Sequence, residues 1–164
     1  MTDSIFDRED FDFETLDEEL KADEQCRRLL QQFYHWLQQQ HSPEESSRLA
    51  FCADYFLRDY VIDFLRCNVL QPQPGQVRHF AASWFVTHTL EPRVVDLDHH
   101  LNAIADLYRF LQAYQLIGDD DLSWILQETN NRDYYQRRLE AFVALAGDGY
   151  DAWGREEPLP RRTK

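Results

Sequence analysis

The chain has 164 residues and a net charge of −13, with 43% hydrophobic and 14% aromatic residues. This length fits one domain with ordinary tails, and the apolar content is sufficient for a packed core, which excludes a globally disordered chain. A strongly acidic chain repels phosphate backbones, so the composition also argues against general nucleic-acid affinity.

The negative charge is concentrated at the N-terminus, where residues 1–24 hold 11 acidic and 2 basic residues. Within residues 1–22 the acids alternate with apolar side chains, namely Phe6, Phe11, Phe13, Leu16 and Leu20. Two interpretations are open. The segment is either a charged, partly disordered arm that joins the first helix, or a docking segment that inserts its phenylalanines into a partner or a second copy of itself.

The three cysteines, Cys26, Cys52 and Cys67, show no Cys-x-x-Cys spacing and lie within apolar helical patterns. An odd number of cysteines without a signal peptide predicts reduced, buried thiols and a cytoplasmic location. No apolar run approaches the length of a membrane span, so we expect neither secretion nor membrane insertion.

Apolar residues recur at helical spacing through most of the chain, and no strand-period pattern or internal repeat is present. Helices are predicted at about residues 23–40, 43–68, 75–90, 96–117, 119–128 and 130–147. The sequence therefore predicts an all-α fold, a single bundle of about five or six helices over residues 23–147. The arm of residues 1–22 precedes this domain, and a flexible tail of residues 148–164 follows it.

Start and stop residues support these boundaries. Ser42 is a suitable N-cap, Pro43 suits the first helical position, and Glu45 stands where a capping box requires it. Asp96 is the expected cap of the fourth helix, which Gly118 should end. Gly147 should end the sixth helix.

The stretch Asp96-Leu-Asp-His99-His100 is the main candidate for chemistry. Asp96 and His100 lie four residues apart, so on a helix they share a face and, with His99, form a candidate metal site of a metal-dependent hydrolase. However, the helix dipole favours aspartates in a first turn, and the sequence nominates no further ligand. We prefer the structural interpretation and expect no metal or cofactor.

Other catalytic motifs are missing from the sequence. There is no Gly-rich phosphate loop, no Gly-x-Ser-x-Gly elbow and no His-Glu-x-x-His, so an enzyme is not expected. His79 and His88 lie on or beside an apolar face, where a histidine is usually a packed side chain. For nucleic acid, Arg137 and Arg138 are candidates for phosphate contact, and the neighbouring Tyr134 and Tyr135 are candidates for base stacking.

Residues 55–117 resemble the SAM-like, N-terminal core-binding domain of tyrosine recombinases and phage integrases. The matching stretches are Tyr60-Val-Ile-Asp-Phe-Leu, "PGQVRHFAASWF" and "LNAIADLYRFLQAYQLI". The resemblance implies an orthogonal helical arrangement and an accessory role at nucleic acid.

The chain also departs from that family. Recombinase chemistry needs an arginine, a His-x-x-Arg and a nucleophilic tyrosine in a second domain, for which the 47 residues after Ile117 leave no room. No His-x-x-Arg occurs, and the fourth helix begins with acids where the family tends to be basic. We therefore expect no recombinase activity, and the implied kinship concerns the fold.

The leading hypothesis is a non-enzymatic protein-interaction or regulatory module that binds a protein partner or forms a homodimer. Its expected partner-binding residues are Phe6, Phe11, Phe13 and Leu16, so that deletion of residues 1–22 should leave the fold intact and weaken association. The alternatives are the nucleic-acid-associated accessory domain and the metal-dependent hydrolase described above.

Overall fold

The computed structural model describes residues 6–145 and 149–160, and these ranges contain helices and no strand. The predicted all-α fold class is confirmed. The elements are η1 (Arg8–Phe11), α1 (Leu16–Leu37), α2 (Pro43–Asp54), η2 (Tyr55–Phe64), α3 (Gln76–His79), η3 (Phe80–Trp84), α4 (Phe85–His88), α5 (Val94–Ala113), α6 (Asp119–Thr129), α7 (Arg132–Val143) and α8 (Tyr150–Arg155). No helix in the described ranges has both the length and the apolar character that crossing a membrane requires.

Several of these elements join into longer rods. η2 is a π-helical continuation of α2, and α3, η3 and α4 follow one another without a break. The wider π turn is visible at the end of η2, where the Leu65 N–H donates to the Tyr60 carbonyl five residues earlier at 2.8 Å. Counted as rods, the described chain has six main helices and two short ones, η1 and α8, in agreement with the predicted bundle.

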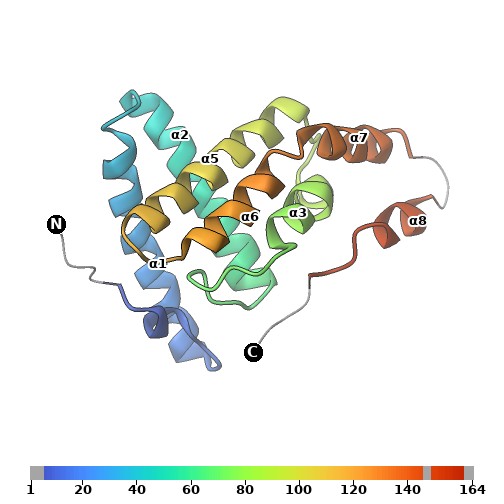
Figure 1. The fold of residues 1–164 in the computed structure, drawn as a ribbon. Helices are drawn as coiled ribbons and strands as arrows, with labels where there is room; N and C mark the ends of the chain where they lie inside the picture. The colour runs from blue at the N-terminus through green and yellow to red at the C-terminus, as the bar shows by residue number, and fades with distance from the viewer. Residues whose placement is uncertain (1–5, 146–148, 161–164) are drawn as a thin grey trace.

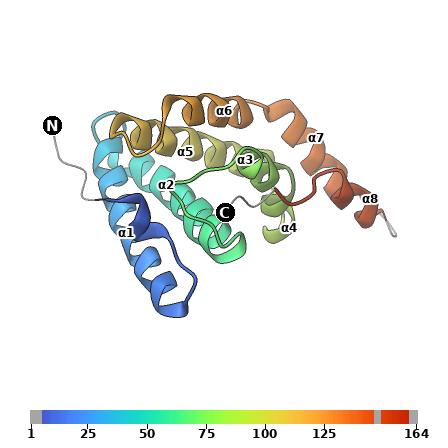
Figure 2. The ribbon, with the colours of Figure 1, turned by 60° about the horizontal axis from the view of Figure 1, so that its bottom comes forward.

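Helix α5 lies at the centre of the bundle. It crosses the middle of the molecule with α2 on one side and α6 on the other (Figures 1 and 2). Because it packs on both sides, its buried residues cover more than one stripe: Leu97, Leu101, Ala103, Ile104, Ala105, Leu107, Tyr108, Phe110 and Leu111.

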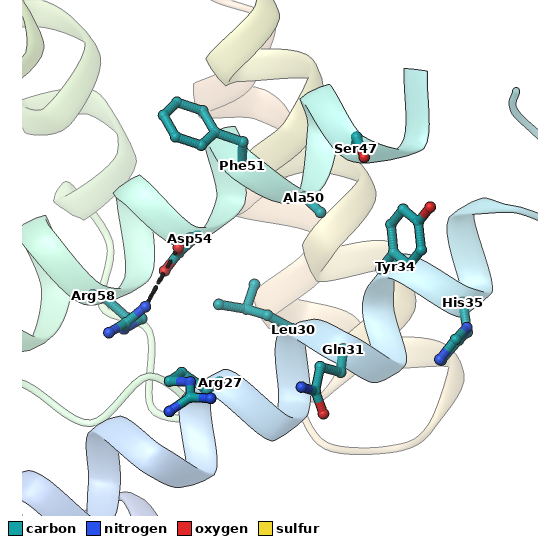
Figure 3. A pocket seen from close by; sticks show the side chains of 10 residues that line it. All are labelled: Arg27, Leu30, Gln31, Tyr34, His35, Ser47, Ala50, Phe51, Asp54 and Arg58. Carbon is teal, nitrogen blue, oxygen red and sulfur yellow. Dashed lines mark hydrogen bonds and ion pairs between the residues drawn. The ribbon is translucent and has the colours of Figure 1, made fainter. Parts of the chain in front are cut away.

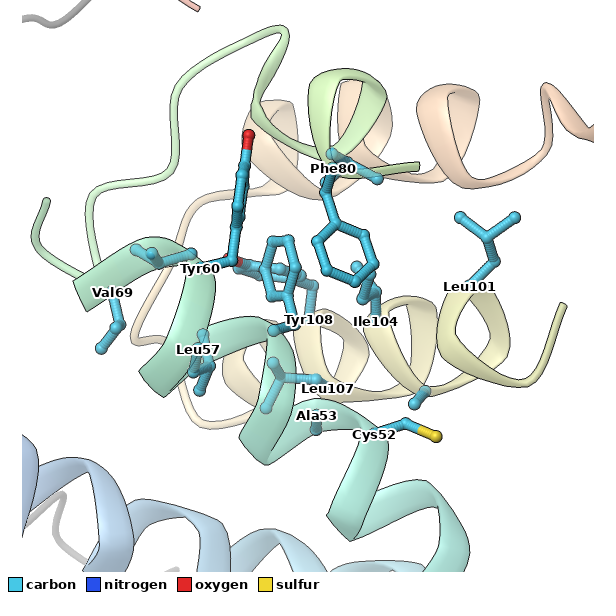
Figure 4. Packing of buried hydrophobic residues seen from close by; sticks show 14 of the residues in the cluster. Cys52, Ala53, Leu57, Tyr60, Val69, Phe80, Leu101, Ile104, Leu107 and Tyr108 are labelled. Carbon is cyan, nitrogen blue, oxygen red and sulfur yellow. The ribbon is translucent and has the colours of Figure 1, made fainter. Parts of the chain in front are cut away.

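Large aromatic side chains fill the space between α5, η2 and η3. Figure 4 shows Tyr60, Phe80 and Tyr108 meeting there, above the aliphatic residues of α2 and α5. The rings of Phe56 and Phe80 are in an edge-to-face arrangement, with centroids 5.1 Å apart, which is a favoured geometry for aromatic pairs.

One polar pair is buried inside this aromatic core. The Tyr60 hydroxyl lies 2.8 Å from His79 Nδ1 and 3.1 Å from the Gln76 carbonyl oxygen. His79 is only 6% exposed, and burial lowers its pKa from 6.5 to about 4. The imidazole is therefore neutral in the folded protein near pH 7, which agrees with its predicted role as a packed side chain.

A carboxylate from α6 caps the start of α3. Glu128 accepts hydrogen bonds from the backbone N–H groups of Gly75 and Arg78, both at 2.8 Å. Gly75 adopts φ +94°, a conformation that glycine reaches without strain. The unpaired N–H groups of a helix start are thus satisfied across the bundle rather than by a local cap.

The described part of the N-terminal segment is packed, which differs from a disordered arm. Phe6 and Phe11 are buried in the main core, and α1 begins at Leu16 rather than near residue 23. The earlier start has a local cause: the Glu18 N–H donates to the Thr15 hydroxyl, and the Thr15 N–H donates to the Glu18 carboxylate, which is a complete capping box. Residues 1–5 lie outside the described ranges.

The structure confirms the predicted cap at Ser42 and differs from the predictions at Asp96 and Gly118. Ser42 caps α2, as predicted, by accepting the Glu45 N–H at 3.1 Å. By contrast, the N-cap position of α5 is Arg93 rather than Asp96, and the Arg93 side chain makes no capping hydrogen bond. Helix α5 ends at Ala113, because the chain turns at Gln115 with φ +61° before it reaches Gly118. Gly118 instead stands at the N-cap of α6.

The C-terminal segment also differs from the predicted flexible tail. Residues 149–160 contain α8, which packs against α7, and Trp153 and Glu157 are both buried. The expected end of the sixth helix at Gly147 falls outside the described residues, as do residues 161–164; the observed helix α7 ends at Val143.

Replacing Phe11 with alanine should test whether the N-terminal segment belongs to the core. Phe11 is 1% exposed, so Phe11→Ala should lower the free energy of unfolding by about 3–5 kcal/mol. Leu16→Ala is the matched control, because Leu16 is 69% exposed and should change stability by at most about 0.5 kcal/mol. Urea unfolding of both variants measures this, and equal, small effects would show that the segment is not part of the core.

The buried His79 should make the fold sensitive to acid. Its pKa is about 4 in the folded chain and 6.5 otherwise, so the unfolded state binds the proton more tightly and stability is lost as pH falls from 6.5 towards 4. At pH 5 the loss relative to pH 7.5 should be about 2 kcal/mol. His79→Gln should remove this part of the pH dependence, whereas replacement of the exposed His35 by glutamine should retain it. Urea unfolding at the two pH values measures the difference.

Candidate functional site

The Asp96 carboxylate is bound by Arg93, which precedes the first residue of α5. The Arg93 Nε donates to it at 3.1 Å, and this hydrogen bond from Arg93 holds the pKa of Asp96 below its usual range. Asp96 thus lies in the first turn of α5, where the helix dipole favours a negative charge, and it forms an ion pair with the N-cap residue, Arg93.

His100 is held by backbone and aromatic rings. Its Nδ1 lies 2.8 Å from the Asp96 carbonyl oxygen, and because a carbonyl only accepts, Nδ1 carries the proton. The ring packs 4.8 Å from that of Phe85 and 5.6 Å from that of Tyr55, and burial lowers its pKa. In residues 6–145 and 149–160, no three His, Cys, Asp or Glu side chains are grouped to hold a metal ion, and this includes the Asp96, His99 and His100 candidates.

These residues instead line an open hollow of about 490 Å³ between α2 and the start of α5. We call it the histidine hollow. Its apolar walls come from Cys52, Tyr55 and Phe85, its imidazoles are those of His88, His99 and His100, and its remaining residues are Arg48, Phe51, Thr89, Leu90 and Asp96. Asp96, His99 and His100, which the sequence placed at one helix start, therefore share a surface.

Large apolar side chains stand at the edge of the histidine hollow. Leu90, in the loop between α4 and α5, is 94% exposed, and Phe51, on the outward side of α2, is 69% exposed. The next residue after Leu90, Glu91, has φ +53°, an uncommon conformation for a residue with a side chain. The loop thus presents Leu90 to solvent next to a partly apolar depression.

Trp84 packs against two residues that line the hollow, His88 and Tyr55. The rings of Trp84 and His88 are stacked with centroids 4.4 Å apart, and Tyr55 lies 5.3 Å from Trp84. The His88 Nδ1 lies 2.9 Å from the Trp84 carbonyl oxygen. These contacts orient the His88 imidazole at the wall of the hollow.

A second hollow, of about 400 Å³, lies between α1 and α2 (Figure 3). We call it the α1–α2 hollow. Leu30, Ala50 and Phe51 give it apolar walls, and Arg27, Gln31, Tyr34, His35, Ser47, Asp54 and Arg58 surround them. Arg58 closes one end, where its guanidinium donates to Asp23 at 2.9 Å and to Asp54 at 3.2 Å. These ion pairs raise the pKa of Arg58 and join α1 to the rod of α2 and η2.

The partner-binding residues expected from the sequence differ in exposure: some are buried in the core and others lie at the surface. Phe6 and Phe11 are buried in the core, and Phe13 is half-buried with the Arg66 guanidinium 5.0 Å from its ring centre. In this conformation neither Phe6 nor Phe11 is available at the surface. Leu16 is exposed, and Leu20, which is 60% exposed, joins it. The four-residue spacing of these two leucines was the available signal for a shared surface.

The nucleic-acid candidates are divided as well. Arg138 is 3% exposed; it donates to the Trp153 carbonyl at 2.7 Å and to the Ala82 carbonyl at 3.1 Å, and its guanidinium lies 3.9 Å from the Trp153 ring centre. Tyr135 is fully buried. The expected phosphate contact by Arg138 and base stacking by Tyr135 are therefore wrong for this conformation, while Arg137 is exposed and Tyr134 is half-buried. Sequence could not reveal this, because the acceptors come from distant parts of the chain.

Three comparisons with known proteins, using family models, curated proteins and solved structures, found no match. The resemblance to the core-binding domain of recombinases thus stays a prediction.

Replacing Arg138 and Arg137 separately should distinguish a structural arginine from a surface one. Arg138→Ala removes the donors to two buried carbonyls and the stack on Trp153, so it should lower the free energy of unfolding by about 3 kcal/mol. Arg137→Ala should change it by at most about 0.5 kcal/mol. Thermal unfolding monitored by tryptophan fluorescence measures both, and equal stability of the two variants would contradict the buried role of Arg138.

Proposed function

We propose that this chain is a non-enzymatic protein-interaction module of the cytoplasm, and that it binds a protein partner at the histidine hollow. The observation that carries the proposal is the 94% exposure of Leu90 beside this hollow. Single exposed leucines are ordinary on protein surfaces. Here, however, Phe51 and Val95, which is 46% exposed, add to the apolar surface around the hollow and the adjoining first turn of α5.

The chemistry of the surface supports a particular kind of partner. An apolar side chain from a helix or loop would fill the space between Tyr55, Phe85 and Leu90, as buried anchors do in protein interfaces. The net charge of −13 favours a partner with a basic surface, because long-range attraction increases the association rate and weakens with salt. Free, buried thiols at Cys26 and Cys52 support a reducing compartment.

Affinity purification from cells that express the protein naturally should identify this partner. The wild-type chain, Leu90→Asp and the control Val143→Asp are used as bait, because Val143 is also exposed, at 64%, but lies at the end of α7. Proteins retained by both the wild type and the Val143→Asp control are then purified, whether or not Leu90→Asp retains them.

Direct titration with the purified partner gives the decisive measurement. Leu90→Asp should weaken binding by about tenfold or more, which is the effect of losing an apolar anchor, and the Val143→Asp control should bind like the wild type. Equal binding by all three chains would exclude the histidine hollow as the binding surface.

A further inference from the structure

The outer face of α1 carries an exposed apolar pair that the fold leaves uncovered. Leu16 and Leu20 are 69% and 60% exposed, and their spacing of four residues places them on the same face of the helix. They lie at the N-terminal end of α1, while the α1–α2 hollow is lined by residues from its C-terminal half, such as Leu30 and Tyr34.

The leucines and the hollow lie on one stripe of the helix. Leu20, Arg27 and Tyr34 follow one another at intervals of seven residues, which keeps them on one side of α1. One end of this stripe therefore projects large apolar side chains, and the other end offers a depression of about 400 Å³ with apolar walls. A surface that contains both a projection and a depression can pair with itself when one copy is reversed.

The charges along α1 also favour an antiparallel pair of α1 helices over a parallel one. Residues 16–24 carry five carboxylates and one lysine, whereas residues 25–37 carry two arginines and no carboxylate. Glu19 and Asp23 are paired with Arg66 and Arg58 of the same chain, so the remaining negative charge of the first half comes from Asp17, Glu18 and Glu24. A parallel pairing would place the acidic halves of two copies against each other. An antiparallel pairing places the acidic half of each copy against the basic half of the other, which lowers the electrostatic cost of bringing two acidic chains together.

We propose that the outer face of α1 binds a second copy of the same chain. The two α1 helices pair in antiparallel orientation about a two-fold axis. In this arrangement Leu20 of each copy enters the α1–α2 hollow of the other, where it lies opposite Gln31. Glu24 and Arg27 flank the axis. They form an ion pair of 2.9 Å within one copy, and in the dimer Glu24 of each copy also faces Arg27 of the other.

This dimer surface differs from the one proposed for a partner protein. It is centred on α1, whereas the histidine hollow lies between α2 and α5. Phe51 lines both hollows, so it is not a useful probe for either proposal. Leu20 and Leu90 report separately on the two surfaces.

Sedimentation of the full chain tests the dimer. We expect a concentration-dependent monomer–dimer equilibrium between about 5 and 200 µM, and Leu20→Glu should weaken the dimer by about tenfold or more. Val143→Glu and Leu90→Asp are controls that should dimerise like the wild type, and circular dichroism checks that all variants are folded. A wild-type chain that stays monomeric at the highest concentration, or a Leu20→Glu chain that dimerises normally, would overturn the proposal.

Two charge variants test the antiparallel register. With Glu24→Arg, positions 24 and 27 both carry arginine, and with Arg27→Glu both carry glutamate. Each variant alone should dimerise more weakly than the wild type, because like charges then face each other across the axis. Mixed in equal amounts, the two should form a heterodimer with at least the wild-type affinity, because every cross-axis contact is then between opposite charges. An effect confined to the ion pair within one copy would not be rescued by mixing, and that result would reject the register.

Discussion

The structure depends on burying α5 from both sides. Its buried residues, from Leu97 to Leu111, cover too much of the helix circumference for one neighbour to shield. α2 covers one side and α6 the other, while the aromatic rings of η2 and η3 fill the remaining space (Figure 4). Since burial of apolar surface is the main favourable term in folding, the packing on α5 accounts for the positions of these elements.

The first and last described segments, which include Phe6, Phe11 and residues 149–160, both pack against this bundle. At the N-terminal end, Phe6 and Phe11 add apolar rings to the core. In the C-terminal segment Trp153 packs in the core, with its ring 4.9 Å from that of Phe142. Polar contacts add to this: Arg138 donates to the carbonyl of Trp153, while Glu157 accepts from Arg78 Nε at 2.9 Å and from the Tyr134 hydroxyl at 2.7 Å. Buried charged groups need such partners to offset their desolvation. Segments that look like charged tails in composition are in this way part of the folded domain.

The features left at the surface are those to which a function can be assigned. Leu90 stands beside the histidine hollow, and Leu16 and Leu20 stand on α1 at the opposite end from the α1–α2 hollow. In the histidine hollow the Asp96 carboxylate is paired with Arg93, and the His100 Nδ1 is bonded to the Asp96 carbonyl. Apolar anchors beside depressions suit protein recognition, which is why both proposals concern binding.

Sequence alone determined the all-α class, the approximate helix positions and the Ser42 cap, because helical periodicity and capping depend on residues only a few positions apart. It also placed Asp96, His99 and His100 together, since they share one helix start. Tertiary structure decided which side chains are exposed. Phe11 and Leu16 look alike in an acidic segment, yet one is buried and the other exposed; Arg137 and Arg138 are neighbours, yet only Arg138 finds buried carbonyls on η3 and α8. The reason is physical: burial depends on what lies across the bundle, and those partners are separated by tens of residues in the chain.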